Sequence, residues 1–223
     1  NDVDLHAILH PAKEVGGDLY DFYMDGNHLY FLIGDVSGKG VPASLFMAIT
    51  RSLFRTLSQH VLSPAKIVTE MNNSISDNNE SNMFVTLIVG ILDLETGILK
   101  LCNAGHNPPI LIYPDGQVSY LEFKTQIFVG VVEDFKYSDE EVVLEKESKL
   151  FLYTDGVTEA ENINKELYGE EKLLEMLSDN ASSDVRTTVN VVVDSIASHV
   201  KEAEASDDLT ILLIQYEPGT ANS

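Results

Sequence analysis

The stretch from Gly16 to Gly40 reads GGDLYDFYMDGNHLYFLIGDVSGKG, and it combines two strand patterns, a turn and two conspicuous aspartates. The strand patterns, 18–24 and 28–34, are rich in aromatic and aliphatic residues, and the Asp-Gly-Asn between them is a hairpin turn signal. Asp18 opens the first pattern, and Asp35 directly follows the second. The stretch therefore predicts an antiparallel hairpin with an aspartate at an end of each strand.

Similar strand and hairpin signals recur along the chain, and apolar residues at helical spacing occur in two pairs of segments. Further strands are predicted at Val3–Leu9, Phe84–Leu94, Ile98–Asn103, Pro109–Tyr113, Val118–Phe123, Glu141–Glu147, Lys149–Thr154 and Leu209–Tyr216. Helices are predicted over Pro42–Gln59, from Ser63-Pro64 toward Ile75, over Gly169–Leu177 and from Ser183 to about Ala203, with a polar loop over Asp77–Asn82. Hairpins separated by helix pairs favour the α+β class with antiparallel sheets over a doubly wound parallel sheet. We predict one domain over residues 1–217 and a C-terminal tail over 218–223.

Composition and charge exclude several classes of partner. Hydrophobic residues make up 44% of the 223 residues, which suits a globular core, and the formal net charge is −22. So acidic a surface repels nucleic acids and anionic membranes, so we expect neither as a partner. Cys102 is the only cysteine, which excludes an internal disulfide.

The sequence also bears on location. The longest nearly unbroken apolar run, Phe84–Leu92, is too short to cross a bilayer, and the start of the chain lacks the pattern of a signal peptide. We therefore expect a cytoplasmic protein. The chain starts abruptly on a strand-like stretch, so we expect a piece of a longer protein, compatible with the cytoplasmic domain of a sensor.

Four strand ends carry aspartate beside glycine or a second aspartate: Gly17-Asp18, Gly34-Asp35, Asp155-Gly156 and Asp207-Asp208. One such pair alone is usually a turn, but four pairs at strand ends indicate a shared functional role. Converging carboxylates repel each other unless cations intervene, and oxygen ligands suit Mg²⁺ or Mn²⁺. Zinc is disfavoured because the six histidines show no ligand pairing and the cysteine stands alone.

Five motifs, in this order, resemble the protein phosphatase 2C superfamily, and specifically its bacterial SpoIIE/RsbU-type branch. They are Val15–Asp21, Gly34–Gly40, Asn103–Pro109, Tyr153–Glu159 and Asp207–Thr210, and together they extend over essentially the whole chain. The resemblance implies a two-sheet antiparallel β-sandwich flanked by helix pairs, with two divalent cations in a cleft at one edge.

The resemblance also implies roles for individual residues. Asp35 would bridge the two metals, and the Val36 backbone carbonyl would complete one site. Asp155 and Asp207 would bind the other metal, and Asp18 would hold a metal directly or through water. Asp208 aligns with a neighbour of weaker role.

Three other residues leave alternatives open. Lys13 stands five positions before Asp18, where the wider superfamily has a phosphate-binding arginine, and it would bind phosphate as a point charge. His106 is either a general acid or part of a structural loop, and we favour the loop. Lys39 reads as a surface lysine, because its spacing is not that of a nucleotide-binding loop.

The implied activity is hydrolysis of phosphoserine or phosphothreonine on a bacterial regulatory protein, such as an anti-sigma-factor antagonist, by water that the two metals activate. An upstream sensory or receiver module would control it, through a shift of the Pro42–Gln59 helix unless this helix only packs the core. Two alternatives stay open: a non-catalytic phosphoprotein-binding module, and a phosphatase for small phosphate esters. The sequence is compatible with a homodimer.

Overall fold

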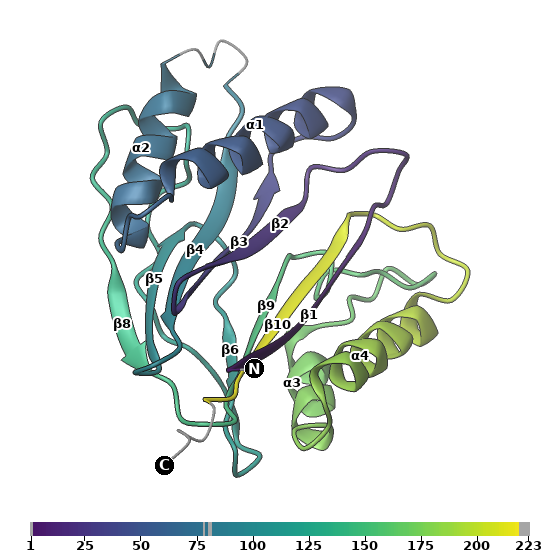
Figure 1. The fold of residues 1–223 in the computed structure, drawn as a ribbon. Coiled ribbons are helices and arrows are strands. Elements are labelled where there is room, and N and C mark those ends of the chain that lie inside the picture. Colours follow the sequence, from purple (N-terminus) through teal and green to yellow (C-terminus); the bar gives the residue numbers. More distant parts are fainter. Residues whose placement is uncertain (1, 78, 80–81, 219–223) are drawn as a thin grey trace, which may run out of the picture. The chain divides into compact units, whose positions relative to one another are not determined.

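The computed structural model describes residues 2–77, 79 and 82–218, and its strands and helices alternate in blocks (Figure 1). The elements are β1 (Val3–His10), β2 (Leu19–Asp25), β3 (His28–Val36), α1 (Val41–Leu57), α2 (Pro64–Ser76), β4 (Val85–Asp93), β5 (Ile98–Ala104), β6 (Ile110–Ile112), β7 (Val118–Tyr120), β8 (Glu140–Val143), β9 (Lys149–Tyr153), α3 (Glu170–Asp179), α4 (Val185–Val200) and β10 (Leu209–Tyr216). Positions 78, 80 and 81 of the predicted polar loop, and all of the predicted tail except Pro218, lie outside the described residues.

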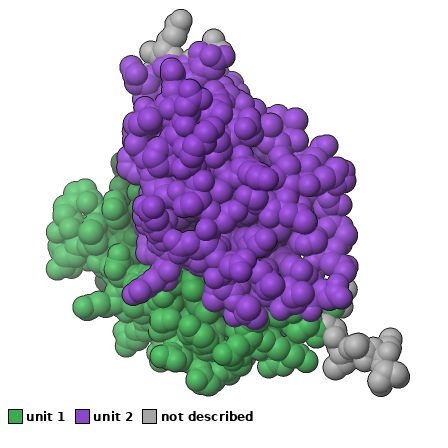
Figure 2. Space-filling view, turned by 90° about the vertical axis from the view of Figure 1, so that its left-hand side faces the viewer, with its two compact units in different colours: residues 1–12, 109–121, 144–223 green, residues 13–108, 122–143 purple. Residues whose placement is uncertain are grey.

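The chain divides into two compact units, which Figure 2 colours separately. Unit 1 contains residues 1–12, 109–121 and 144–223, and unit 2 contains residues 13–108 and 122–143. Each unit holds one five-stranded sheet and one pair of helices. Every pairing between neighbouring strands of these sheets is antiparallel. The predicted α+β class, with two antiparallel sheets and two helix pairs, is confirmed.

The sheet of unit 2 has the strand order β2-β3-β4-β5-β8, and α1 and α2 cover one of its faces (Figure 1). Tyr30 and Leu32 of β3 belong to the core cluster beneath these helices. Phe31 and Ile33, which alternate with them on the opposite face, are buried as well. Burial of both faces explains why β3 and β4 are nearly continuous apolar runs rather than alternating ones.

The sheet of unit 1 has the order β1-β10-β9-β6-β7, so the first and last strands of the chain are neighbours. Ile211 and Leu213 of β10 pack in one cluster with Val189, Val192 and Ile196 of α4. Ser63, where the sequence predicts a helix start, caps α2, and Asp184, one residue after the predicted start at Ser183, caps α4.

Two predicted strands end at least three residues earlier than expected. The pattern over 118–123 predicts six residues, but β7 ends at Tyr120, and the pattern over 141–147 predicts seven, but β8 ends at Val143. Glu147 has a φ of 69°, a left-handed conformation that does not continue a strand. The turn around it leads directly into β9.

Asp21 anchors α1 to the sheet of unit 2. Its buried carboxylate, on β2, accepts hydrogen bonds from Arg55 Nε at 2.6 Å and Nη2 at 2.5 Å, and Arg51 Nε lies 3.2 Å away. The Arg55 guanidinium also lies over the Tyr23 ring. Burial by itself would raise the pKa of Asp21, but the hydrogen bonds from Arg55 and Arg51 outweigh it and hold that pKa below its ordinary value.

Replacing Arg55 tests this anchor. Arg55→Met should lower the free energy of unfolding by about 1–2 kcal/mol, because a buried carboxylate loses a bidentate partner while half-exposed Arg51 remains. Arg51→Met is the matched control, with one longer contact and an expected loss below about 1 kcal/mol. Urea unfolding measures both; equal losses would contradict the dominant role of Arg55.

The same anchor predicts a pH dependence. A carboxyl group whose pKa is lowered in the folded state stabilises the fold above its unfolded pKa, near 4, and that contribution is lost as the pH falls through the folded value. The stability difference between wild type and Arg55→Met should therefore be constant from pH 5 to 7 and narrow below about pH 4.

Candidate metal-binding site

Asp18 and Asp35 lie at the open end of the β2–β3 hairpin in unit 2. In the register of this hairpin Leu19 pairs with Gly34. Asp18 precedes Leu19 and Asp35 follows Gly34, so the register, continued by one step, sets the two aspartates opposite each other. Residues directly opposite in an antiparallel pair project from the same face. Asp18 is buried and Asp35 is half-buried.

The Val36 carbonyl lies against the glycine that precedes Asp18. A Cβ atom on Gly17 would stand 3.0 Å from the Val36 carbonyl oxygen, so only glycine fits there without a shift. Ser44 in the first turn of α1 donates from Oγ to the Gly16 carbonyl at 2.9 Å, which ties the same loop to the helix. Asp18, Asp35 and the Val36 carbonyl are thus brought together within unit 2.

Asp155 and Asp207 form a second pair in unit 1. β9 ends two residues before Asp155, and its antiparallel neighbour β10 begins two residues after Asp207. Between them, Thr154 N donates to the Thr210 carbonyl at 3.1 Å, and Thr210 N donates to Thr154 Oγ1 at 3.1 Å. Both aspartates therefore leave the same end of the β9–β10 ladder, and both are half-buried.

Asp208 has a different environment from Asp207. It is buried, and its Oδ1 accepts a hydrogen bond from Ala12 N at 2.8 Å, while its own N–H donates to Asp207 Oδ1 at 2.9 Å. These bonds fix the loop that carries Asp207.

Gly156 is required for the turn after Asp155 to approach the Asp207 loop. A Cβ atom there would stand 1.9 Å from the Asp208 carbonyl oxygen, far inside contact distance and against backbone rather than a flexible side chain. Any larger residue must push the two loops apart.

We predict that Gly156→Ala lowers the free energy of unfolding by about 2–3 kcal/mol, because the added methyl group overlaps backbone. Gly116→Ala is the control in the same unit: its φ is 91°, yet the nearest atom to an added Cβ is 3.9 Å away. It should cost only the backbone strain, about 1 kcal/mol. Urea denaturation of both variants measures these losses. Equal losses of unfolding free energy would mean that the close approach at Gly156 does not contribute to the cost.

His106 is held in unit 2 by a network that the sequence did not reveal. Its N–H donates to Asn103 Oδ1 at 2.8 Å, its carbonyl accepts from Asn103 Nδ2 at 3.0 Å, and its ring Nδ1 lies 3.0 Å from Thr86 Oγ1. Thr86 in turn pairs with Asp35 across β3–β4. These bonds agree with the interpretation of His106 as part of a structural loop. Thr86 stands between His106 and Asp35.

The remaining candidates are simpler. Lys13 and Lys39 are both exposed, as a phosphate contact or a surface lysine requires. Cys102 is fully buried, and burial raises the pKa of its thiol far above the ordinary range, so it is an unreactive core residue.

The four predicted aspartates therefore lie as two pairs, one in each unit. Within the described part of the chain, no group of three or more His, Cys, Asp and Glu side chains is assembled that could hold a metal ion. The donors present in unit 2 are two carboxylates and a backbone carbonyl that the glycine leaves accessible, and those in unit 1 are two carboxylates. Hard oxygen donors of this kind fit Mg²⁺ or Mn²⁺.

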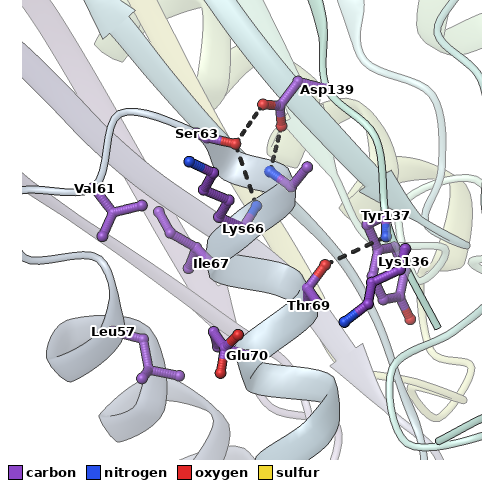
Figure 3. Close-up of a pocket in the computed structure, with 11 residues that line it drawn as sticks. Leu57, Val61, Ser63, Lys66, Ile67, Thr69, Glu70, Lys136, Tyr137 and Asp139 are labelled. Atoms are coloured by element: carbon purple, nitrogen blue, oxygen red, sulfur yellow. Dashed lines mark hydrogen bonds between the residues drawn. The ribbon is translucent and has the colours of Figure 1, made fainter. Parts of the chain in front are cut away.

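A cavity of about 700 Å³ in unit 2 contains none of the predicted site residues. It lies between the end of α1, the first turns of α2 and residues 136–139 (Figure 3). Its polar groups bond to each other: Asp139 accepts from Ser63 Oγ at 2.6 Å and from Ala65 N at the start of α2. Size alone therefore does not locate the chemistry. In unit 1, by contrast, Asp207 and Gly156 line a smaller cavity of about 210 Å³.

Solved structures define the class of fold. The SiaA PP2C domain of Pseudomonas aeruginosa matches with a TM-score of 0.86 over 96% of this chain and 86% of its own, at 22% identity. RsbX, solved in complex with magnesium, matches with a TM-score of 0.72 over 96% of this chain and 94% of its own, at 19% identity. The fold is that of the PP2C-type domains.

Sequence comparison defines the family. The chain belongs to the SpoIIE family, described as stage II sporulation protein E, whose model matches residues 25–217. The resemblance found in the motifs is thereby confirmed. Phosphoserine phosphatase RsbU from Bacillus subtilis (strain 168) is 27% identical over 96% of this chain and 63% of its own length. This chain spans from about a third to just under two thirds of the length of the curated relatives that it matches.

Proposed function

We propose that this chain is the catalytic domain of a metal-dependent protein serine/threonine phosphatase. The observation that carries the proposal is the placement of aspartates in pairs at strand ends, Asp18 with Asp35 and Asp155 with Asp207, in a member of the SpoIIE family. A relative named as a phosphoserine phosphatase supports the reaction, and a structural neighbour that contains magnesium supports the choice of cation.

In this proposal the two pairs would supply the ligands of two cations, Mn²⁺ or Mg²⁺. Asp35 would hold both cations, the Val36 carbonyl would complete one ligand set, Asp155 and Asp207 would belong to the other, and Asp18 would bind directly or through water. When bound, such cations supply the positive charge that activates a water molecule and offsets the charge of the phosphoryl oxygens. The support is the donor chemistry, because every candidate ligand is a hard oxygen.

The chain's own charges make the cations necessary. A protein of net charge −22 repels a phosphate ester, and four carboxylates close to the reacting group would add to that repulsion. Lys13, exposed and five residues before Asp18, provides one point charge for the phosphoryl group. A single exposed lysine contributes little by itself, so binding of the phosphate depends on the metals.

We also propose the substrate and the control of the enzyme. The substrate is a phosphorylated regulatory protein in the cytoplasm, such as an anti-sigma-factor antagonist, and an upstream sensory or receiver module controls its hydrolysis. The attachment of α1 supports such control. Ser44 donates to the Gly16 carbonyl, before the start of β2, and Arg55 donates to Asp21, just after it. A shift of α1 would therefore move the loop that carries Asp18.

No helix in the described ranges has both the length and the apolar character that a membrane crossing needs.

A metal-dependence assay tests the proposal. Hydrolysis of p-nitrophenyl phosphate and of a phosphoserine peptide should require Mn²⁺ or Mg²⁺ and fall at least about a hundredfold in excess EDTA, because water activation and charge neutralisation are lost together. Re-addition of Mn²⁺ should restore the rate, which controls for irreversible damage by the chelator. Full activity in EDTA would contradict the metal mechanism, and peptide binding without hydrolysis would favour a binding module.

A further inference from the structure

The cavity beside Asp207 lies wholly within unit 1. It measures about 210 Å³ and is enclosed by α4, the end of β1, the turn after β9 and the loop between α4 and β10. Its apolar lining comes from residues of α4 together with residues at both strand ends: Pro11, Ala160, Val193, Ile196, Ala197, Val200 and Leu209. By volume it holds several water molecules or one large side chain.

The apolar lining on α4 lies at the edge of the core of unit 1. Val189 and Val192 are fully buried and belong to the core cluster, as expected for the inward face of an amphipathic helix. Val193 and Val200 pack against the same cluster but stay half-buried, and Ala197 between them is exposed. These three residues, at i, i+4 and i+7, line the cavity.

The polar lining of the cavity is mainly acidic. Glu161, Glu204 and Asp207 belong to it together with His10, and its lining residues include no lysine or arginine. Lys165 forms an ion pair with Glu161 at 2.7 Å, and Asp207 is a proposed metal ligand, so Glu204 is the carboxylate left to attract a basic residue. An occupant that complements this site is apolar at its tip and basic, not acidic, beside it.

The segment that borders the cavity extends the apolar surface. Glu161 forms a bridge with Leu167, and the short loop between them exposes Ile163 and Leu167, at 69% and 53%. His199 of α4 holds this loop through a 2.9 Å contact from its ring Nε2 to the Glu166 carbonyl. Exposed apolar side chains beside an apolar cavity are typical of protein-binding surfaces, and they extend past what a small ligand covers.

We propose that this cavity receives an aliphatic side chain of the phosphoprotein substrate, from a residue close in sequence to the phosphorylated serine or threonine and next to a lysine or arginine. The inference rests on the proposed function, because Asp207 lines the cavity and is one of the proposed metal ligands. An occupant in contact with the Asp207 loop is necessarily close to the phosphoryl group. The cavity thus selects the substrate by sequence, while the metals act on any phosphate ester.

The test compares phosphoserine peptides that carry Leu-Lys, Ala-Lys or Leu-Glu at successive positions on either side of the phosphoserine. The wild-type chain with Mn²⁺ should prefer Leu-Lys over both others by at least about tenfold in kcat/KM, at one position at least. Ala197→Trp, which fills the cavity, should remove the preference for leucine. The readout is the ratio of peptide to p-nitrophenyl phosphate turnover.

Two further variants make the test specific. Ser198→Trp adds the same bulk at the next, exposed position of α4, which does not line the cavity, and it should keep the preference. Glu204→Lys should change the preference from Leu-Lys toward Leu-Glu, and it tests the site even if Ala197→Trp does not fold.

The outcomes separate this inference from the proposed function. Any of three results would overturn the cavity's role. The wild type could show no sequence preference, or the preference could survive both Ala197→Trp and Glu204→Lys. The variants could also lose activity equally on the peptide and on p-nitrophenyl phosphate. If the wild type hydrolyses nothing, the proposed function fails, and fluorescence anisotropy of the labelled Leu-Lys peptide then tests the cavity separately. Binding to the wild type that is lost in Glu204→Lys would support the peptide-binding site. Equal binding to both proteins would reject it.

Discussion

The pairing of Leu19 with Gly34 in the β2–β3 hairpin is the constraint on which the candidate site of unit 2 depends. Because side chains alternate between faces, a slip of one residue in this register would turn Asp18 and Asp35 toward opposite faces of the sheet. Burial of both faces of β3 makes such a slip costly, since it would misplace every apolar side chain along the strand. In unit 1 the β9–β10 ladder places Asp155 and Asp207 at the same end of one strand pair.

This constraint carries an electrostatic cost. Strand pairing brings two carboxylates to one strand end in each unit, in a chain that already has a net charge of −22. Like charges that are held close oppose folding, whereas a divalent cation converts the repulsion into binding. The close approaches at Gly17 and Gly156 show that the backbone, too, is shaped around these positions. Core strands thus fix the candidate ligands, and cations bound to them would give an acidic protein a means of binding phosphate.

Local sequence patterns predicted much of this arrangement. Aspartate beside glycine or a second aspartate at strand ends pointed to Asp18, Asp35, Asp155 and the pair Asp207-Asp208, and the family resemblance ranked Asp207 above Asp208. The hairpin turn at 25–27 was sufficient to pair β2 with β3. The single domain over 1–217 and the ligand roles stay predictions. The predicted lengths of β7 and β8 were wrong, and the positive φ of Glu147 in the turn before β9 has no signal in the residue type.

Interactions between distant segments could not be predicted. Asp21 was part of a recognised motif, but its partner Arg55 lies 34 positions away, and only the packing of α1 on β2 brings them together. His106 meets Thr86 for the same reason, through the pairing of β4 with the strands around it. The cavity beside Asp207 combines β1, α4 and the loop before β10, so no window of sequence contains it.

The central proposal is that the paired aspartates at the strand ends bind divalent cations, and a double-mutant cycle on metal affinity within unit 2 tests it most directly. Mn²⁺ binding should be measured by calorimetry for wild type, Asp18→Asn, Asp35→Asn and the double variant, with circular dichroism to verify folding. If both residues serve one metal centre, their effects are coupled, and the double variant should depart from additivity by at least about 1 kcal/mol. Additive losses, or Mn²⁺ affinity unchanged in either single variant, would contradict the account.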